Sequence, residues 1–365
     1  MSIRALSVFP WITKPLLANA PMAVTAGPAL AVAVSSAGGL GFIGPGARTS
    51  DTDQDLKEAS SIIEKVRAAG TPSRITSSLP SNHPTFPVGV GFLVWKDELE
   101  TAMAAVASYK PCAVWLYAPP NGQPDLDLWT QRIRSASSAT QVWIQIGTVA
   151  EAQAIVSSVE HPDAVVVQGA EAGGHGRDKD GMGLVTLFPE VADVFRGQGG
   201  DTDSGIALLA AGGIADGRGA AAALCLGASG VVMGTRFLAS NEARIRNGYR
   251  DEVVRATNGA VNTTRTLLYN HLRGTYGWPG PFSPRTIVNR SWEEYQAGVP
   301  FEELKSRHDE AQREGDAGWG PEGRLGTYAG AGIGLIGDAQ DAAIIVDRVR
   351  QDTAKRLARA QTAIS

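Results

Sequence analysis

The chain has 365 residues, of which 43% are hydrophobic and 19% are charged, a composition that excludes a disordered protein. Its formal net charge is −4 without a basic stripe, so nucleic acid is not an expected partner. Two cysteines exclude a disulfide framework and favour a reducing compartment, and no apolar run approaches the ~18 residues of a membrane helix, so we expect a cytoplasmic protein that is not bound to a membrane.

Short apolar runs alternate with amphipathic segments of helical length over the first two thirds of the chain. The expected strands are Leu16–Met22, Leu40–Ile43, Val88–Leu93, Ala113–Tyr117, Val142–Ile146, Ala164–Gln168, Ile206–Ala211 and Gly230–Met233. Most are continuous apolar runs, which is typical of strands buried on both faces. The helical segments between them include Pro28–Ala37, Asp51–Ala69, Glu98–Tyr109, Val149–Val159 and Gly217–Leu226. Eight such repeats favour an α/β fold of the closed (β/α)₈ TIM barrel type over a doubly wound sheet.

Residues 256–327 interrupt this alternation. They are rich in Arg, Gly, Trp and Pro and include a polar helical pattern over Trp292–Gln312, and a last amphipathic helix follows at Ala339–Ala360. We therefore expect a barrel over residues 1–255, a small helical cap or substrate domain over 256–327, and a loop with the final barrel helix over 328–365. A decorated barrel loop without its own core is the alternative that the pattern leaves open.

Glycines follow the last two expected strands. Ala211–Ile214 (Ala-Gly-Gly-Ile) comes after the seventh strand, and Met233–Arg236 (Met-Gly-Thr-Arg) comes after the eighth. The backbone N–H groups of Gly212, Gly213 and Gly234 can approach an anion without hindrance from a Cβ, and Thr235 adds a hydroxyl. Because β/α barrels often bind a phosphate between these two loops, the pair favours a phosphate site over simple tight turns.

One histidine follows a strand among glycines. The stretch Gln168–Arg177 reads QGAEAGGHGR, in which His175 lies between glycines and Gln168 ends an apolar run at the barrel mouth. We expect this loop to be flexible and exposed, so that His175, with an unperturbed pKa of about 6.5, can transfer protons. The remaining histidines are expected at the surface; they are His83, His161, His271 and His308.

Two further stretches are candidates for ligand contacts. Asn19–Met22 ends the first strand, and Pro21 and Met22 offer an apolar, polarizable floor for a flat ring, although core packing explains this stretch equally well. Tyr328–Gly334 reads YAGAGIG, but its glycine order and the lack of a preceding strand argue against a nicotinamide-binding Rossmann motif. We expect this loop to pack its backbone close to a ring system.

Together and in this order, these four stretches resemble the nitronate monooxygenase family, long called 2-nitropropane dioxygenases, from about Leu16 to Ile336. QGAEAGGHGR is the most specific stretch, whereas the two glycine turns also occur in other phosphate-binding flavin barrels. The resemblance implies an FMN-containing TIM barrel with a second helical domain that closes over the flavin. We expect no metal site.

The resemblance also assigns roles to individual positions. The residues that would line the flavin ring are Ala20, Pro21 and Met22. Those that would contact the isoalloxazine and the ribityl chain are Gln168, Gly173 and Gly174. Those that would hold the phosphate are Gly212, Gly213, Met233, Gly234 and Thr235. His175 would be the base that removes the proton α to the nitro group, or the group that orients the nitronate.

Two positions depart from the family's pattern. Relatives commonly carry Asn after Gly-Val in the third strand, where its side chain meets the flavin, and Gly91 would leave that contact empty. The fourth strand often supplies Phe or His near the substrate, whereas here it carries Trp115 and Tyr117. Side chains two residues apart in a strand face the same side, so we expect both to line the substrate cavity beside the flavin. A bulkier or aromatic-stacked substrate would fit this change.

The leading interpretation is an FMN-dependent oxidoreductase that oxidises an alkyl nitronate, a nitroalkane or a related small acidic substrate with O₂. One alternative keeps the fold and resembles the flavin enoyl-acyl carrier protein reductases, which share the Gly-Gly-His loop and use NAD(P)H. Another is a diverged flavin-binding accessory protein without catalysis. The sequence leaves open the physiological substrate, the use of NAD(P)H and whether the chain forms a homo-oligomer.

Overall fold

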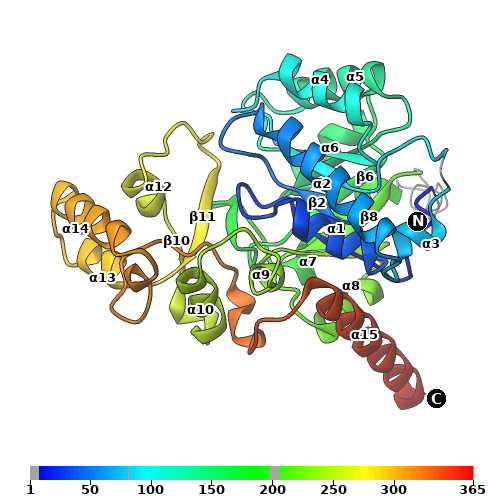
Figure 1. The fold of residues 1–365 in the computed structure, drawn as a ribbon. Helices are drawn as coiled ribbons and strands as arrows, with labels where there is room; N and C mark the ends of the chain where they lie inside the picture. The colour runs from blue at the N-terminus through cyan, green and yellow to red at the C-terminus, as the bar shows by residue number, and fades with distance from the viewer. Residues whose placement is uncertain (1–7, 81, 197–204, 365) are drawn as a thin grey trace.

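The computed structural model describes residues 8–80, 82–196 and 205–364, and its centre is an eight-stranded parallel sheet (Figure 1). The strand order is β1-β9-β8-β6-β5-β4-β3-β2, and a parallel bridge between Ala18 and Leu40 joins the two ends. The strands are β1 (Leu16–Asn19), β2 (Phe42–Ile43), β3 (Gly89–Leu93), β4 (Ala113–Tyr117), β5 (Gln141–Ile146), β6 (Ala164–Gln168), β8 (Ala207–Ala211) and β9 (Gly230–Met233). The expected closed (β/α)₈ barrel is confirmed.

Helices cover the outside of this barrel and bury its outer apolar face. They are α1 (Pro28–Ser36), α2 (Asp51–Ala68), α3 (Arg74–Ser78), α4 (Leu99–Tyr109), α5 (Gln123–Ala136), α6 (Val149–Ser157), α7 (Leu184–Arg196), α8 (Gly217–Cys225) and α15 (Ala342–Ile364). Local sequence explains several starts: the Asp216 carboxylate accepts from the first N–H groups of α8, and Thr148 and Glu151 cap α6 together. The C-terminal helix α15 returns to pack on α8 and α1.

Large aromatic side chains fill the inside of the barrel. Phe42, Trp115 and Trp143 form one buried cluster, with ring centroids 5.3 Å apart for Phe42–Trp115 and 6.0 Å apart for Trp115–Trp143. The Trp115 indole donates to Gln145 Oε1 at 3.0 Å. Trp115 is only 2% exposed, so the expectation that it lines a substrate cavity is wrong. It does face the same side as Tyr117, which packs against this cluster nearer the mouth.

The join between β1 and β2 depends on one buried side chain. Asn19 Nδ2 donates to the Phe42 carbonyl at 2.8 Å, and Asn19 Oδ1 accepts from the Phe42 N–H at 2.9 Å. Asn19 is fully buried. Its amide thus supplies both hydrogen bonds to Phe42 that a neighbouring strand would otherwise make.

Asn19→Ala is therefore expected to destabilise the barrel. The change leaves two buried polar groups of Phe42 unpaired, and each costs about 1–3 kcal/mol, so we expect a loss of about 2–6 kcal/mol in the free energy of unfolding. Urea unfolding followed by tryptophan fluorescence measures it. The exposed Asn121→Ala is the control, with an expected change within about 0.5 kcal/mol. Equal midpoints for the two variants would contradict the role of Asn19.

The part of the chain from α9 to α14, called the late segment below, packs beside the barrel mouth as short helices and strands (Figure 1). Its elements are α9 (Thr235–Leu238), α10 (Asn247–Arg255), α11 (Gly259–Asn262), β10 (Thr263–Arg265), α12 (Leu268–Leu272), β11 (Phe282–Ile287), α13 (Arg290–Gln296) and α14 (Phe301–Arg313). The helix expected over Trp292–Gln312 is two helices, because Gly298 has a φ of +84° and Pro300 precedes α14. Within the described ranges, no helix has both the length and the apolar character needed to cross a membrane.

A three-stranded antiparallel sheet, β10-β11-β7, links this segment to the barrel. Its edge strand β7 (Gly174–Arg177) belongs to the loop that follows β6. The late segment has a small apolar cluster of its own; its members are Leu268, Tyr269, Leu272 and Leu304. The division into a barrel and a separate substrate domain over 256–327 stays a prediction.

Candidate active site

The ends of β8 and β9 form a cradle of backbone N–H groups. Gly212 and Gly213 have φ values of +104° and +71°, a region that residues with a Cβ rarely adopt. Among the described residues, the N–H groups of Gly213 and Gly234 donate to no acceptor. A Cβ at Gly234 would lie 3.6 Å from Ala20 Cβ and 3.7 Å from Met22 Sδ, so the end of β1 borders the cradle. Free N–H groups at successive strand ends suit an anion such as a phosphate.

The Tyr328–Gly334 loop lies against this cradle. The Gly330 N–H donates to Thr235 Oγ1 at 2.9 Å, which leaves the Thr235 hydroxyl hydrogen available to a ligand. The Ala331 N–H donates to the Glu171 carbonyl at 2.8 Å. A Cβ at Gly173 would lie 2.3 Å from the Gly330 nitrogen, so Gly173 directly contacts the loop backbone. The expected close approach of this loop's backbone is to a ring system, whereas in the structure the loop backbone lies close to the backbone of Gly173 and Glu171.

The end of β1 packs over β3. A Cβ placed on Gly91 would lie 2.5 Å from Pro21 Cβ. Pro21 therefore occupies the space where a side chain of residue 91 would lie, and the expectation that Gly91 leaves the flavin contact empty stays a prediction. Ala20 is held in place by its N–H, which donates to the Met233 carbonyl at 3.0 Å.

His175 lies on a strand and is largely enclosed. In β7 it pairs with Pro284 of β11, and its imidazole stacks on the Trp278 indole with centroids 3.4 Å apart and an angle of 5° between the planes. Asn270 Nδ2 lies 2.8 Å from His175 Nε2. The expectation of a flexible, exposed loop is wrong, because hydrogen bonds to β11 and the Trp278 ring hold this residue.

The surroundings of His175 oppose its protonation. Burial, together with the positive charges of Arg265 and Arg273, lowers the pKa of His175 to about 3. Desolvation disfavours the imidazolium, and like charges add to that cost. The expectation of a pKa of about 6.5 for His175 is therefore wrong. His308, expected at the surface, is also buried, at 2% exposure.

Partly buried polar side chains hold the loop that carries His175. The His175 carbonyl accepts from Tyr117 Oη at 3.0 Å and from Gln168 Nε2 at 3.3 Å. Arg265 donates to the Ala170 carbonyl at 3.1 Å, and Arg285 donates to the same oxygen at 3.2 Å. The sequence predicted that Gln168 and Tyr117 lie at the barrel mouth. It did not predict the positions of Arg265 and Arg285, because the arginine-rich composition of residues 256–327 was the only feature that pointed to them.

Aromatic rings gather around Tyr117. Its ring centroid lies 5.2 Å from that of Phe282 and 6.5 Å from that of Trp278, and Trp278 lies 5.1 Å from Trp95. Burial raises the pKa of the Tyr117 phenol, so it stays protonated and can donate. These rings come from the turn after β3, from β4, from β11 and from the segment before β11, so they join the barrel mouth to the late segment.

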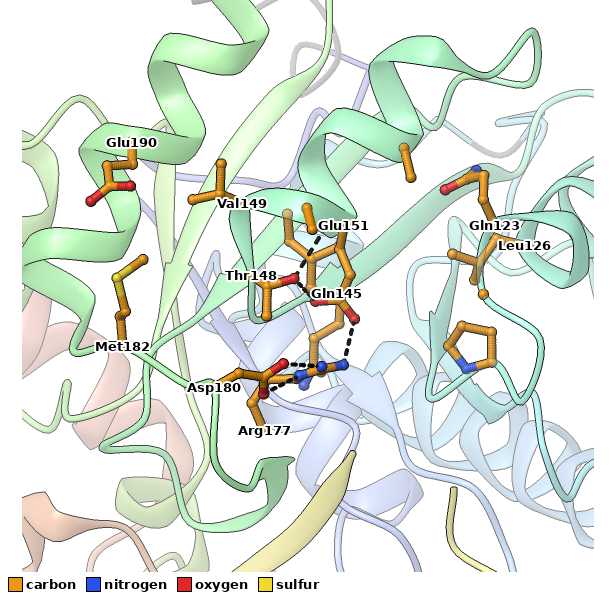
Figure 2. A pocket seen from close by; sticks show the side chains of 15 residues that line it. Gln123, Leu126, Gln145, Thr148, Val149, Glu151, Arg177, Asp180, Met182 and Glu190 are labelled. Carbon is orange, nitrogen blue, oxygen red and sulfur yellow. Dashed lines mark hydrogen bonds and ion pairs between the residues drawn. The ribbon is translucent and has the colours of Figure 1, made fainter. Parts of the chain in front are cut away.

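A cavity of about 610 Å³ lies outside this cluster, between α5, α6 and the chain after β7 (Figure 2). Arg177 crosses its floor and forms ion pairs with Glu151 and Asp180. Gln145 and Met182 also line it. Neither His175 nor the cradle glycines are among its lining residues, so it is distinct from the cradle.

Comparison with known proteins agrees with this geometry. A family model described as nitronate monooxygenase matches residues 8–84 and 124–275. The nitronate monooxygenase npaC of Metarhizium robertsii is 55% identical over 343 residues, which cover 93% of this chain and 91% of that protein. A nitronate monooxygenase of Neurospora crassa is 32% identical over 97% of this chain and 93% of its own length.

Solved structures show the same fold. FabK from Thermotoga maritima superposes with a TM-score of 0.69 at 25% identity, covering 100% of this chain and 99% of its own. Nitroalkane oxidase from Streptomyces ansochromogenes superposes with a TM-score of 0.68 at 24% identity, covering 99% of this chain and 100% of its own. With a matching family model, a relative 55% identical over nearly its whole length, and this fold, the chain belongs to the nitronate monooxygenase family of flavin-dependent oxidoreductases.

Proposed function

We propose that the protein binds FMN and oxidises alkyl nitronates with O₂. The observation that carries this proposal is the cradle of free N–H groups at Gly213 and Gly234 beside the end of β1. A single cradle for one phosphate group suits FMN. In this arrangement Gly212, Gly213, Met233, Gly234 and Thr235 hold the phosphate, and Ala20, Pro21 and Met22 line the ring. Bound there, the flavin supplies the electron acceptor that afterwards reacts with O₂.

The charges near His175 favour an anionic substrate. Among the described residues, neither Arg265 nor Arg273 takes part in an ion pair, and both act on His175. The carboxylates of Asp178 and Glu171 act on Arg265 from a distance, but no ion pair within the described ranges neutralises either guanidinium, and such positive charge attracts an anion to a partly dry site. A nitronate carries that charge, whereas a neutral nitroalkane does not. We therefore infer that the nitronate is the form that binds.

The role of His175 follows from its pKa. Because that pKa is lowered to about 3, the imidazole is neutral at all higher pH values but is a weak proton acceptor. A weak acceptor is poorly suited to remove the proton from a neutral nitroalkane. We therefore assign His175 to the second role that the resemblance implies, which is orienting the nitronate.

Mass spectrometry of the released cofactor and stopped-flow reduction test this function. We expect FMN, and anaerobic reduction of the flavin by a pre-formed alkyl nitronate at a rate well above that with the freshly dissolved neutral nitroalkane. Oxygen consumption should follow the nitronate concentration. FAD, or no flavin, would contradict the cofactor proposal. Rapid reduction by NADPH with none by nitronate would favour the enoyl reductase alternative.

Tyr117→Ala is expected to change substrate preference while the flavin content stays near that of the wild type. The change opens space between Phe282 and Trp278, so kcat/KM should shift by about tenfold or more toward longer alkyl nitronates, as expected for a few methylene groups in an apolar pocket. A series of nitronates of increasing chain length measures it. Tyr295→Ala, at an exposed position, is the control. Loss of flavin in Tyr117→Ala would instead place Tyr117 in the packing around the cofactor.

A further inference from the structure

Three side chains from separate elements form a hydrogen-bonded chain that ends on His175. The Tyr328 hydroxyl lies 2.8 Å from Asn270 Oδ1, and Asn270 Nδ2 lies 2.8 Å from His175 Nε2. Asn270 belongs to α12, is 1% exposed and lies 95 residues from His175 in sequence. The barrel mouth and the late segment are therefore coupled through the imidazole.

The direction of this chain follows from the hydrogen bond at its far end. Arg273 lies over the Tyr328 ring, with its Cζ 5.5 Å from the centroid, and its positive charge opposes the burial that raises the pKa of Tyr328. The Tyr328 hydroxyl donates its hydrogen to Asn270 Oδ1. An amide oxygen can only accept and an amide NH₂ can only donate. The Asn270 oxygen therefore faces Tyr328, and its NH₂ faces His175.

A donor that faces Nε2 determines the form of the imidazole. Neutral imidazole has one N–H and one acceptor nitrogen, and the acceptor must be the nitrogen that faces the Asn270 NH₂. The hydrogen is then on Nδ1, which has no partner among the described residues. The stack on Trp278 fixes the plane of the ring, so this Nδ1–H has a defined direction.

We propose that Asn270 and Tyr328 are positioning residues that hold His175 as the Nδ1–H tautomer, so that it offers a hydrogen-bond donor and no free base. The tautomer itself is inferred independently of the proposed function; only its purpose, which is to orient a nitronate oxygen, rests on that function. It explains why the family's histidine need not abstract a proton here. The occupied Nε2 cannot accept a substrate proton while the Asn270 bond persists.

Nitrogen NMR of protein labelled with ¹⁵N-histidine tests the tautomer directly. The five histidines include His175, whose signals are assigned by their absence in His175→Phe. We expect the pattern of a neutral ring with hydrogen on Nδ1 and an unprotonated, hydrogen-bonded Nε2. A ring with hydrogen on Nε2 would overturn the proposal, whatever the activity. A correct tautomer in a protein that does not oxidise nitronates would instead overturn the proposed function alone.

Asn270→Asp should reverse the tautomer. A carboxylate accepts a hydrogen bond from Nε2–H and stabilises the imidazolium. The positive charges of Arg265 and Arg273 oppose that protonation, while the phenols of Tyr117 and Tyr328 stay neutral. We expect the flavin to stay bound, the His175 signal to titrate at a higher pH than in the wild type, and kcat/KM for nitronate to fall by about tenfold to a hundredfold. An unchanged tautomer and titration would contradict the proposal.

Tyr328→Phe tests the same chain without adding a charge. It frees the Asn270 amide to rotate, so both tautomers should appear and nitronate kcat/KM should fall by a few-fold. The matched control is Tyr269→Phe, since the Tyr269 hydroxyl donates to Asn289 Oδ1 at 2.6 Å in a buried pair that does not contact His175. Tyr269→Phe should leave the His175 signals unchanged. The same spectral change in both variants would show a structural effect and overturn the proposal.

Discussion

Gly213→Asp is expected to give a folded protein that purifies nearly free of flavin. Gly213 has a φ of +71° and lies in the backbone cradle, with its N–H free of any acceptor among the described residues. A carboxylate there would face the cofactor's phosphate. Two like charges about 4 Å apart near a protein surface repel by about 4 kcal/mol, which corresponds to a loss of about two to three orders of magnitude in affinity.

Gly298→Asp is the matched control for this variant. Gly298 also has a positive φ, +84°, but a Cβ there meets nothing within 4 Å. It therefore imposes comparable backbone strain without a charge at the cradle. The ratio of visible flavin absorbance to protein absorbance, with circular dichroism to check folding, measures the difference. Full flavin content in Gly213→Asp would contradict the phosphate site, and equal flavin loss in both variants would show that backbone strain is the cause.

His175→Phe is expected to keep the flavin and to lose most nitronate turnover. The phenyl ring can still stack on Trp278 but offers no N–H. Removal of one preorganised donor from an anion-binding site costs about 10²–10³-fold in rate, and kcat on a pre-formed nitronate should fall by that order. His161→Phe, at an exposed position, is the control and should behave as the wild type does.

The pH profile separates orientation from proton transfer. A histidine whose pKa is lowered to about 3 is neutral above that value, so it contributes no ionisation to the wild-type profile on nitronate between about pH 5 and 8. Initial rates at constant ionic strength measure the profile. A limb near pH 6.5 that disappears in His175→Phe would show a base of ordinary pKa and contradict this assignment.

The sequence by itself was sufficient for the barrel and for the glycine turns that form the backbone cradle. Each of the eight expected apolar runs overlaps a strand, because continuous Val, Ile, Leu and Ala runs are a local property that burial on both faces requires. The glycine turns after β8 and β9 were equally local, since a positive φ at Gly212 and Gly213 selects glycine. The side on which Trp115 and Tyr117 face was also predictable from the period of a strand. Their depth in the barrel was not.

Only the tertiary structure determined the burial and the pKa of His175. Its neighbours in sequence are glycines, which indicated an exposed loop, but its partners Asn270, Trp278 and Tyr328 come from segments about 95 to 150 residues later. Burial and the charges of Arg265 and Arg273 then lower its pKa. Likewise, Asn19 gave no local sign that it joins β1 to β2. A pKa or a buried hydrogen bond depends on which groups meet across space, and local periodicity carries no information about those partners.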